Sequence, residues 1–223
     1  MYIALSILVV LLPYLLGSIP TAVWVSRGMF GTDIRTQGSG NAGSTNMFRI
    51  LGAKAGIITQ IVDIAKGTLA AFLPLILANA FPEDPSFISG WEMEMQKLFC
   101  GLIAVIGHIY PVFAAFRGGK GINTLLGMML ATNPLAAGVC LIVWISVLYL
   151  TRYVAVASMA AVASYPLFLV VKAMATGAEM NPLLIGLGAG MALLVVFTHR
   201  SNIANLMAGK EHRNRWFEGK IKG

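Results

Sequence analysis

Two polar stretches interrupt a chain that is otherwise rich in apolar residues, and both contain the residue types that bind phosphate. The first, TQGSGNAGSTNMFR, covers residues 36–49, and the second, FRGGKG, covers residues 116–121. Glycines allow the backbone N–H groups of a loop to turn toward an anion and approach it closely. Hydroxyl and amide side chains add hydrogen-bond donors, and an arginine can hold two phosphate oxygens at once. Both stretches are therefore candidate phosphate-binding loops.

The first stretch carries the larger set of donors. We predict that the phosphate contacts come from Gly38, Ser39, Gly40, Asn41, Thr45, Asn46 and Arg49. The apolar run that follows predicts a helix whose N-terminus, with its partial positive charge, faces the loop. The alternative is a flexible polar connector with a helix cap, but a connector does not need so many donors together with an arginine.

The first stretch also matches, letter by letter, a pattern of dinucleotide-binding loops. G-x-G-x-x-G occupies residues 38–43, and Asp63 follows about twenty residues later. That pattern requires a strand before it and a βαβ unit around it. The segment before the loop is expected to be an apolar helix typical of membranes instead of a strand, so we reject a dinucleotide site.

The second stretch is similar to the end of a nucleotide-binding P-loop but does not complete that motif. Ala114 stands where the motif requires its first glycine, and Gly121 replaces the final serine or threonine. Gly118 and Gly119 can still present backbone N–H groups to an anion, and Lys120 adds a point charge. The alternative is a glycine break between two membrane spans, with a lysine at the cytoplasmic surface.

Further polar residues lie near the ends of apolar runs. His108 precedes the second stretch, and we include it among the candidate substrate-binding residues, although a lone helical histidine is more often structural. His199 and Asn202 follow the last apolar run, and Glu211 is the acidic residue in their neighbourhood. A surface ion pair between Glu211 and Arg215, four residues later, is the other interpretation of that acid.

Asp63 and Lys66 lie three residues apart inside an apolar run, so they share one face of the predicted helix. Charges inside a membrane span are costly unless they pair or face a cavity. We interpret the two residues as a neutralised structural pair.

Several common catalytic patterns are missing from the sequence. No histidine is followed by an aspartate at the spacing His-x4-Asp, and G-x-S-x-G, H-E-x-x-H and a carboxylate cluster are also missing. Cys100 and Cys140 lie inside apolar runs and predict buried thiols rather than a disulfide or a metal site. The sequence therefore indicates neither an activated serine nor a metal, and we expect no cofactor.

The composition of the whole chain is that of a membrane protein. Of its 223 residues 57% are hydrophobic and 11% are charged, which is too little charge for a soluble domain of this size. We predict an all-α, polytopic integral membrane protein with seven transmembrane helices in a single domain, 1–223. The predicted spans are 2–26, 53–80, 97–116, 121–132, 135–151, 154–172 and 182–198. The fourth is shorter than the ~20 residues of a full span, but Asn133-Pro134 separates it from the fifth.

The distribution of basic residues predicts which side of the membrane each segment faces. Lys and Arg concentrate in residues 27–54, in residues 117–120 and in the tail from residue 199, whereas Lys97 and Lys172 fall on the opposite side. The positive-inside rule then predicts an N-terminus outside and a C-terminus in the cytoplasm. Both polar stretches and the tail would lie on the cytoplasmic face. The net charge of +7 is explained by this topology and by an anionic membrane surface rather than by nucleic acid.

Three segments are similar to the cytoplasmic motifs of a known family. GSGNAGSTNMFR (38–49), GHIYPVFAAFRGGKG (107–121) and SNIANLMAGKE (201–211) resemble those of the PlsY-type acyl-phosphate:glycerol-3-phosphate acyltransferases of bacteria. The resemblance covers the whole chain in motif order and spacing. It implies that a fatty acyl phosphate donates its acyl group to the 1-hydroxyl of glycerol 3-phosphate. The products would be 1-acylglycerol 3-phosphate (lysophosphatidic acid) and inorganic phosphate, in the first acylation of phospholipid synthesis.

The resemblance also implies roles for the candidate residues. One phosphate would be held by Ser39, Asn41, Thr45, Asn46 and Arg49. The glycerol 3-phosphate loop would consist of Gly118, Gly119, Lys120 and Gly121. The site would be closed from the tail by His199, Asn202 and Glu211. The residues with implied catalytic roles are Ser39, Arg49, Lys120, His199, Asn202 and Glu211. The proton of the attacking hydroxyl would pass either to the donor's own phosphate or to His199.

Two positions depart from the family pattern. Asn205 stands where many members carry arginine, and Ala155 stands where many carry serine. If either position normally contacts a phosphate, neighbours such as Arg200, Arg152 or Ser158 must supply the contact in this chain.

Two other functions are compatible with parts of the sequence. A transporter or flippase of a phosphorylated solute would suit the Asp63–Lys66 pair and the Asn133-Pro134 break, but it needs polar groups near the midplane, whereas most polar residues of this chain gather on one face. An acyltransferase with a thioester donor is chemically compatible, and the basic tail could bind its carrier. We interpret that tail as a membrane-surface anchor with Trp216 and Phe217. We expect membrane lipids but no obligatory protein partner, and a place in the bacterial inner (cytoplasmic) membrane with the site on the cytoplasmic face.

Overall fold

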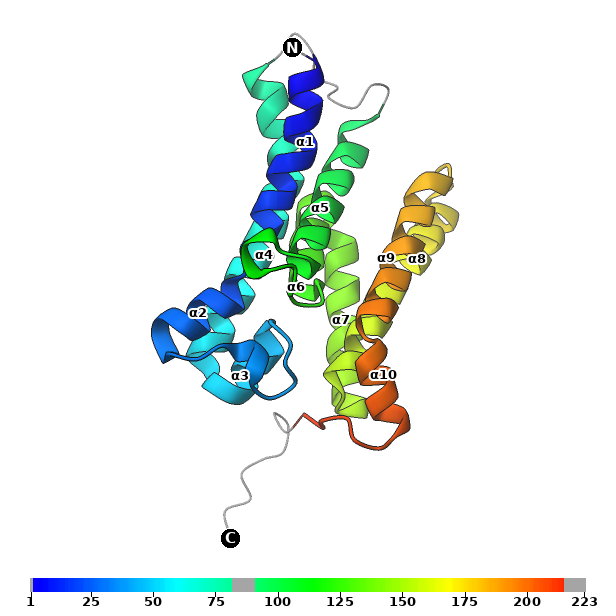
Figure 1. Ribbon diagram of the computed structural model, residues 1–223. Helices are drawn as coiled ribbons and strands as arrows, with labels where there is room; N and C mark the ends of the chain where they lie inside the picture. The colour runs from blue at the N-terminus through cyan, green and yellow to red at the C-terminus, as the bar shows by residue number, and fades with distance from the viewer. Residues whose placement is uncertain (1, 82–90, 215–223) are drawn as a thin grey trace. The chain divides into compact units, whose positions relative to one another are not determined.

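The computed structural model of the chain describes residues 2–81 and 91–214 (Figure 1). Within these ranges the regular secondary structure is helical with no β-strand, which confirms the all-α prediction. In chain order the elements are α1 (Tyr2–Gly17), α2 (Thr21–Phe30), η1 (Ile34–Thr36), α3 (Ser44–Leu51), α4 (Ala53–Ala80), α5 (Met93–Ile109), η2 (Val112–Ala114), α6 (Ile122–Thr132), α7 (Pro134–Thr151), α8 (Val154–Thr176), α9 (Pro182–Thr198) and α10 (Arg200–Met207). The η elements are short 3₁₀ helices.

Every predicted apolar span is mostly helical, although the first and third spans contain breaks at residues 18–20 and 110–111. Among the described residues, the helices that are long and apolar enough to cross a membrane are Ile7–Phe30, Ala53–Ala80, Met93–Ala114, Pro134–Thr151 and Val154–Thr176. α9 and α10 add a further span if they count as one helix bent by 58°. α6 has 11 residues, whereas a full crossing needs about 20. Seven crossings and the orientation of the termini therefore stay predictions.

The chain divides into two compact units, residues 1–134 and 135–223. In the first unit α4 and α5 form the centre, α1 packs against both, and α6 packs against both (Figure 1). Glycines permit these close approaches, because a Cβ on Gly107 would collide with the Tyr14 carbonyl oxygen and one on Gly127 with the Ile64 carbonyl oxygen. The Thr68 hydroxyl donates to the Gly127 carbonyl at 2.9 Å across the same α4–α6 contact. Small residues and such hydrogen bonds are the usual means of contact between membrane helices.

The predicted first span is interrupted between α1 and α2. The break lies at residues 18–20, where Pro20 cannot donate the backbone hydrogen bond that would continue α1. The Ile19 carbonyl in the break accepts a hydrogen bond from Lys66 Nζ of α4 at 2.8 Å. The ammonium group of Lys66 on α4 therefore contacts the backbone at the break between α1 and α2.

The second unit contains α7 to α10. α8 packs against α9, and a Cβ on Gly188 of α9 would lie 3.0 Å from the Tyr165 ring of α8. The segment after α10 returns to the turn between α7 and α8, where the Asn214 N–H donates to the Arg152 carbonyl at 2.7 Å. Arg215 and the predicted anchor residues that follow it lie outside the described residues.

Candidate functional site

The first polar stretch folds as a compact loop followed by a short helix. η1 begins the loop and α3 starts at Ser44, so Thr45, Asn46 and Arg49 are helical rather than part of a loop. Gly52, with φ of 85°, then separates α3 from the long apolar helix α4. The helix that presents its N-terminus to the loop is thus the polar α3 and not the predicted apolar span. No side chain caps that N-terminus.

Asn46 shapes this loop from inside. Its side chain is 1% exposed, and its Oδ1 accepts a hydrogen bond from the Ser39 N–H at 3.1 Å. Its Nδ2 donates to the carbonyl oxygens of Ile34, Gln37 and Asn41 at 3.3, 3.0 and 3.1 Å. Both ends of the side-chain amide therefore face the loop's own backbone. We expected a direct phosphate contact from Asn46, and the geometry favours a role in shaping the loop instead.

Apolar residues below the loop attach it to α2 and α4. Ile34 and Met47 are fully buried and pack with Ala22 and Val23 of α2 and with Ala55 of α4. Burial of these side chains stabilises the loop in one position on the unit. The polar residues above them are consequently presented on a fixed surface.

Asp33, which the sequence did not single out, links the first stretch to the second through Arg35. The Asp33 carboxylate accepts hydrogen bonds from Nη2 of Arg35 and from Nη2 of Arg27, each at 2.8 Å. Nη1 of Arg35 donates to the carbonyl oxygen of Ala114, just before the second stretch, at 2.9 Å. The hydrogen bond from Arg35 holds the pKa of the Asp33 carboxyl well below its usual range, although partial burial opposes this effect. The only signal in the sequence was an Asp-x-Arg spacing, which is too common to indicate such a link.

The glycines of the second stretch make a close backbone contact with the end of α5. The Gly119 N–H donates to the His108 carbonyl and the Gly118 N–H to the Ile109 carbonyl, both at 3.2 Å. A Cβ on Gly118 would collide with the same His108 oxygen. Both N–H groups satisfy carbonyls that the end of a helix leaves without partners, which favours a structural role for them over the predicted open anion nest. Lys120 and Gly121, where α6 begins, remain the candidate ligands of this loop.

The two polar stretches meet in the first unit. Nδ2 of Asn123, at the start of α6, donates to the Ser44 hydroxyl at 2.9 Å, where α3 starts. A Cβ on Gly119 would lie 2.9 Å from the Ala42 carbonyl oxygen. Asn123 was not among the predicted residues, and its isolated position in an apolar helix gave no signal of this contact. The convergence of the two stretches agrees with the prediction that they share one face.

The predicted ligands on this surface differ in exposure. The exposed residues are Gly38, Ser39, Gly40 and Arg49, and the half-buried ones are Asn41, Thr45 and Lys120. They combine hydroxyl, amide, guanidinium and ammonium donors, which is the composition of a site for a phosphate-bearing ligand. His108 is buried behind them, with Nδ1 3.6 Å from Oδ1 of Asp63. Asp63 is paired with Lys66 at 2.8 Å, which confirms the predicted ion pair.

The remaining predicted residues form a group of their own in the second unit. His199 lies at the bend between α9 and α10 and is 4% exposed, with Nδ1 2.8 Å from the Val195 carbonyl oxygen. A proton on Nδ1 would satisfy that carbonyl and make Nε2 the basic nitrogen. Nδ2 of Asn202 donates to Oε1 of Glu211 at 2.8 Å, so the acid orients the amide. Ser158, one of the residues considered as a substitute ligand, accepts a hydrogen bond from Trp144 Nε1 at 3.3 Å.

Comparison with known families and proteins gives matches over nearly the whole chain. A family model described as glycerol-3-phosphate acyltransferase matches residues 7–209. A glycerol-3-phosphate acyltransferase of Salinibacter ruber is 41% identical over 212 residues, which cover 94% of this chain and 93% of the relative. Glycerol-3-phosphate acyltransferase 2 of Bacillus cereus is 40% identical over 200 residues, 90% of each chain.

Two solved structures resemble the fold. One is the glycerol 3-phosphate form of PlsY, an integral membrane glycerol 3-phosphate acyltransferase, with a TM-score of 0.79 and 35% identity over 97% of this chain and 99% of that one. The other is the lysophosphatidic acid form of PlsY, with a TM-score of 0.75 and 35% identity over 93% and 94% of the two chains.

Proposed function

The chain belongs to the glycerol-3-phosphate acyltransferase family, and we propose that it transfers a fatty acyl group from an acyl phosphate to the 1-hydroxyl of glycerol 3-phosphate. The match covers the first two motifs and residues 201–209 of the third, so the predicted family resemblance is confirmed. The names of the relatives support the acceptor substrate. The acyl phosphate donor, the product 1-acylglycerol 3-phosphate and a cytoplasm-facing site in the inner membrane are parts of the proposal. Membership of an acyltransferase family disfavours the transporter alternative.

The proposed reaction needs no covalent enzyme intermediate, because an acyl phosphate is already an activated mixed anhydride. The oxygen of the 1-hydroxyl attacks the acyl carbonyl carbon, an ester bond forms, and the bond from the acyl carbon to the phosphate oxygen breaks. The hydroxyl proton and the electron pair of the broken bond leave with inorganic phosphate. Orientation of two bound reactants can supply on the order of 7–11 kcal/mol of the barrier reduction. The protein therefore has to provide two phosphate sites and hold the two reactants in a fixed geometry.

The observation that supports this proposal most is the contact between the two polar stretches in the first unit. The Asn123–Ser44 hydrogen bond and the close approach of Gly119 to Ala42 place Lys120 and the first stretch on neighbouring backbone. Both substrates carry phosphate, and two adjacent sets of cationic and neutral donors suit them. We assign Ser39, Asn41, Thr45 and Arg49 to one phosphate and Lys120 with Gly121 to the glycerol 3-phosphate. Asn46, Gly118 and Gly119 shape the loops.

We propose that an oxygen of the donor's phosphate accepts the proton of the attacking hydroxyl. The polar residues of the second unit have a supporting role. Phosphate that leaves with the proton needs no protein base. His199 is tightly buried beside Val195, and its Nδ1 contact with that carbonyl fixes the ring. His199, Asn202 and Glu211 keep the supporting role that the family resemblance implies for them.

The variant His199→Ala tests this assignment. We expect kcat to fall by less than ~100-fold, below the 10²–10⁴ that a general base contributes, and the shape of the pH profile of kcat/KM to stay as in the wild type. The profile is measured by phosphate release between acidic and alkaline pH. Loss of the acidic limb of the profile in the variant would identify His199 as the base and would contradict the proton transfer to phosphate.

The experiment for the whole function is phosphate release by purified protein in detergent or a lipid phase. Palmitoyl phosphate is supplied with and without glycerol 3-phosphate, and palmitoyl-CoA is tested in parallel. We expect release that requires both palmitoyl phosphate and glycerol 3-phosphate, with 1-acylglycerol 3-phosphate detected by mass spectrometry. Acylation from palmitoyl-CoA alone would replace the proposed donor by a thioester. No acylation with either donor, together with uptake of glycerol 3-phosphate into proteoliposomes, would favour the transporter.

A further inference from the structure

A cluster of polar side chains lies buried where α4 meets the break between α1 and α2. Asp63 is its centre and is 1% exposed. Its Oδ1 accepts hydrogen bonds from Lys66 Nζ at 2.8 Å and from the Thr21 hydroxyl at 3.1 Å. Lys66, 3% exposed, also donates to the Ile19 carbonyl at 2.8 Å. Ionisable residues within a membrane span are costly and usually serve a function, so this cluster calls for a role beyond the neutral pair that the sequence predicted.

His108 connects this cluster to the second polar stretch. Its Nδ1 lies 3.6 Å from the same Oδ1 of Asp63. Its other ring nitrogen faces the loop, because a Cβ on Gly119 would collide with His108 Nε2. The backbone of His108 also accepts the Gly119 N–H at 3.2 Å. The imidazole is therefore held between the carboxylate of α4 and the glycine loop.

Gly119 in turn contacts the first polar stretch. A Cβ on this residue would lie 2.9 Å from the Ala42 carbonyl oxygen, so the two backbones are nearly in contact. Lys120 is the next residue and is half-buried. A shift of the His108 ring away from Asp63 and toward the loop would therefore displace Gly119, and with it change the distance between Lys120 and the first stretch.

We propose that Asp63 is a positioning residue for the glycerol 3-phosphate site, and that it acts through His108. Lys66 and Thr21 fix the carboxylate, the carboxylate fixes the imidazole, and the imidazole fixes Gly119 and the start of the Lys120 loop. This inference rests on the proposed function, because it names the substrate whose binding the cluster controls. A pair with only a structural role would change the stability of the unit without selecting one substrate.

The test uses the double variant Asp63→Asn/Lys66→Met in the full-length protein. Removing one partner alone would leave an uncompensated buried charge, whereas removing both leaves a neutral and similarly sized pair. Thr21→Val is a milder variant that removes one hydrogen bond to Asp63 and no charge. Thr68→Val is the matched control, because Thr68 lies on the same helix and makes a partly buried hydrogen bond to the Gly127 carbonyl instead. The KM of each substrate and kcat are measured, with amide hydrogen exchange of residues 107–121.

We expect the double variant to raise the KM for glycerol 3-phosphate by about tenfold or more, since a misplacement on the order of 1 Å has effects of this size. The KM for palmitoyl phosphate should not change, and exchange at Gly118 and Gly119 should become faster. Thr21→Val should raise the same KM by about threefold, the effect of one hydrogen bond, and Thr68→Val should leave both KM values as in the wild type.

The inference is overturned if the KM for glycerol 3-phosphate stays unchanged in the double variant and in Thr21→Val. It is equally overturned if Thr68→Val raises that KM as much as they do. Hydrogen exchange needs no turnover, so it tests the link from Asp63 to the loop independently of the proposed function. If wild-type protein releases phosphate without glycerol 3-phosphate, the proposed function fails, and unchanged exchange in the variants would then independently remove the link from Asp63 to the loop.

Discussion

Arg49→Ala is expected to lower kcat/KM for acylation of glycerol 3-phosphate by about 100-fold, the effect of losing charge-assisted hydrogen bonds to a phosphate. Arg49 lies in the last turn of α3 and is exposed, on the element that also carries Thr45. A guanidinium can bind two phosphate oxygens through parallel N–H groups, which neither water nor a hydroxyl reproduces. The loss should appear in the KM of one substrate, which identifies the phosphate that Arg49 holds. The measurement is steady-state phosphate release with each substrate varied in turn.

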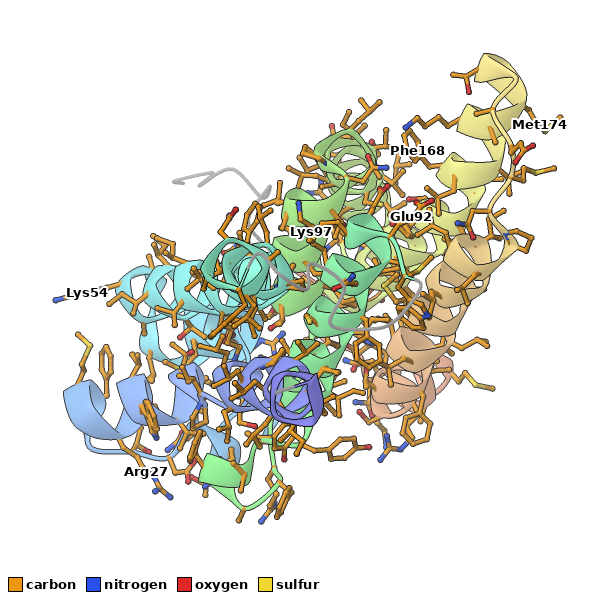
Figure 2. The ribbon with its side chains drawn as sticks, turned by 90° about the horizontal axis from the view of Figure 1, so that it is seen from above. Arg27, Lys54, Glu92, Lys97, Phe168 and Met174 are labelled. Atoms are coloured by element: carbon orange, nitrogen blue, oxygen red, sulfur yellow. The ribbon has the colours of Figure 1, made fainter. Side chains whose placement is uncertain are left out.

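Two further variants separate the fork geometry of Arg49 from its charge. Arg49→Lys keeps the charge but not the two parallel donors, and we expect activity between that of the wild type and Arg49→Ala. Lys54→Ala is the matched control for loss of a basic side chain nearby, since Lys54 is exposed at the start of α4 and points away from the molecule (Figure 2). It should behave as the wild type. An equal loss in Lys54→Ala and Arg49→Ala would mean that only the net charge of this surface matters.

Gly119→Ala is expected to reduce kcat/KM by about 100-fold or more, because the added methyl group has to push the loop away from the His108 ring and the Ala42 backbone. The new Cβ would collide with His108 Nε2 and approach the Ala42 carbonyl oxygen to 2.9 Å. Neither neighbour is the end of a flexible side chain, since His108 is buried and Ala42 contributes backbone. The loop must therefore move, and Lys120 moves with it. Kinetic assay and thermal unfolding of the same preparation show whether activity is lost in a protein that is still folded.

Gly28→Ala is the control for this substitution. A Cβ on Gly28, in α2, meets nothing within 4 Å, so this variant adds the same methyl group in open space. It should retain wild-type activity and stability. If Gly119→Ala also retains them, the close approach of the second stretch to His108 and Ala42 does not matter for the reaction.

The helical elements and the surface that carries the candidate site could be predicted from the sequence because both rest on local patterns. Each apolar run became mostly helical, although the first is broken between α1 and α2, since a span of apolar residues has no favourable alternative in a membrane. Clusters of basic residues predicted that the two polar stretches share a face, and Asn123 and Ser44 now connect those stretches. The break at Pro20 had a local signal as well, but the length of the apolar run concealed it.

Whether an individual hydrogen-bond donor faces a ligand or the protein's own backbone could not be predicted in this way. Asn46 and Ser39 are equally polar in the sequence, yet one is buried under the loop and the other is exposed on it. The N–H groups of Gly118 and Gly119 were expected to face a ligand, but the end of α5 supplies carbonyls that bind them first. Such outcomes depend on which backbone groups meet across the fold. A motif states which donors are present, and tertiary contacts decide which of them are already engaged.

The amide of Asn46 has a thermodynamic consequence for any ligand of the first loop. Because its contacts with Ser39, Gln37 and Asn41 form within the protein itself, the loop has its shape before a ligand arrives. Ordering a flexible segment on binding costs free energy that would otherwise appear as affinity. A phosphate that meets this loop loses little to that cost. Recognition at this surface therefore proceeds with a rigid receptor, and discrimination between ligands depends on their fit to it.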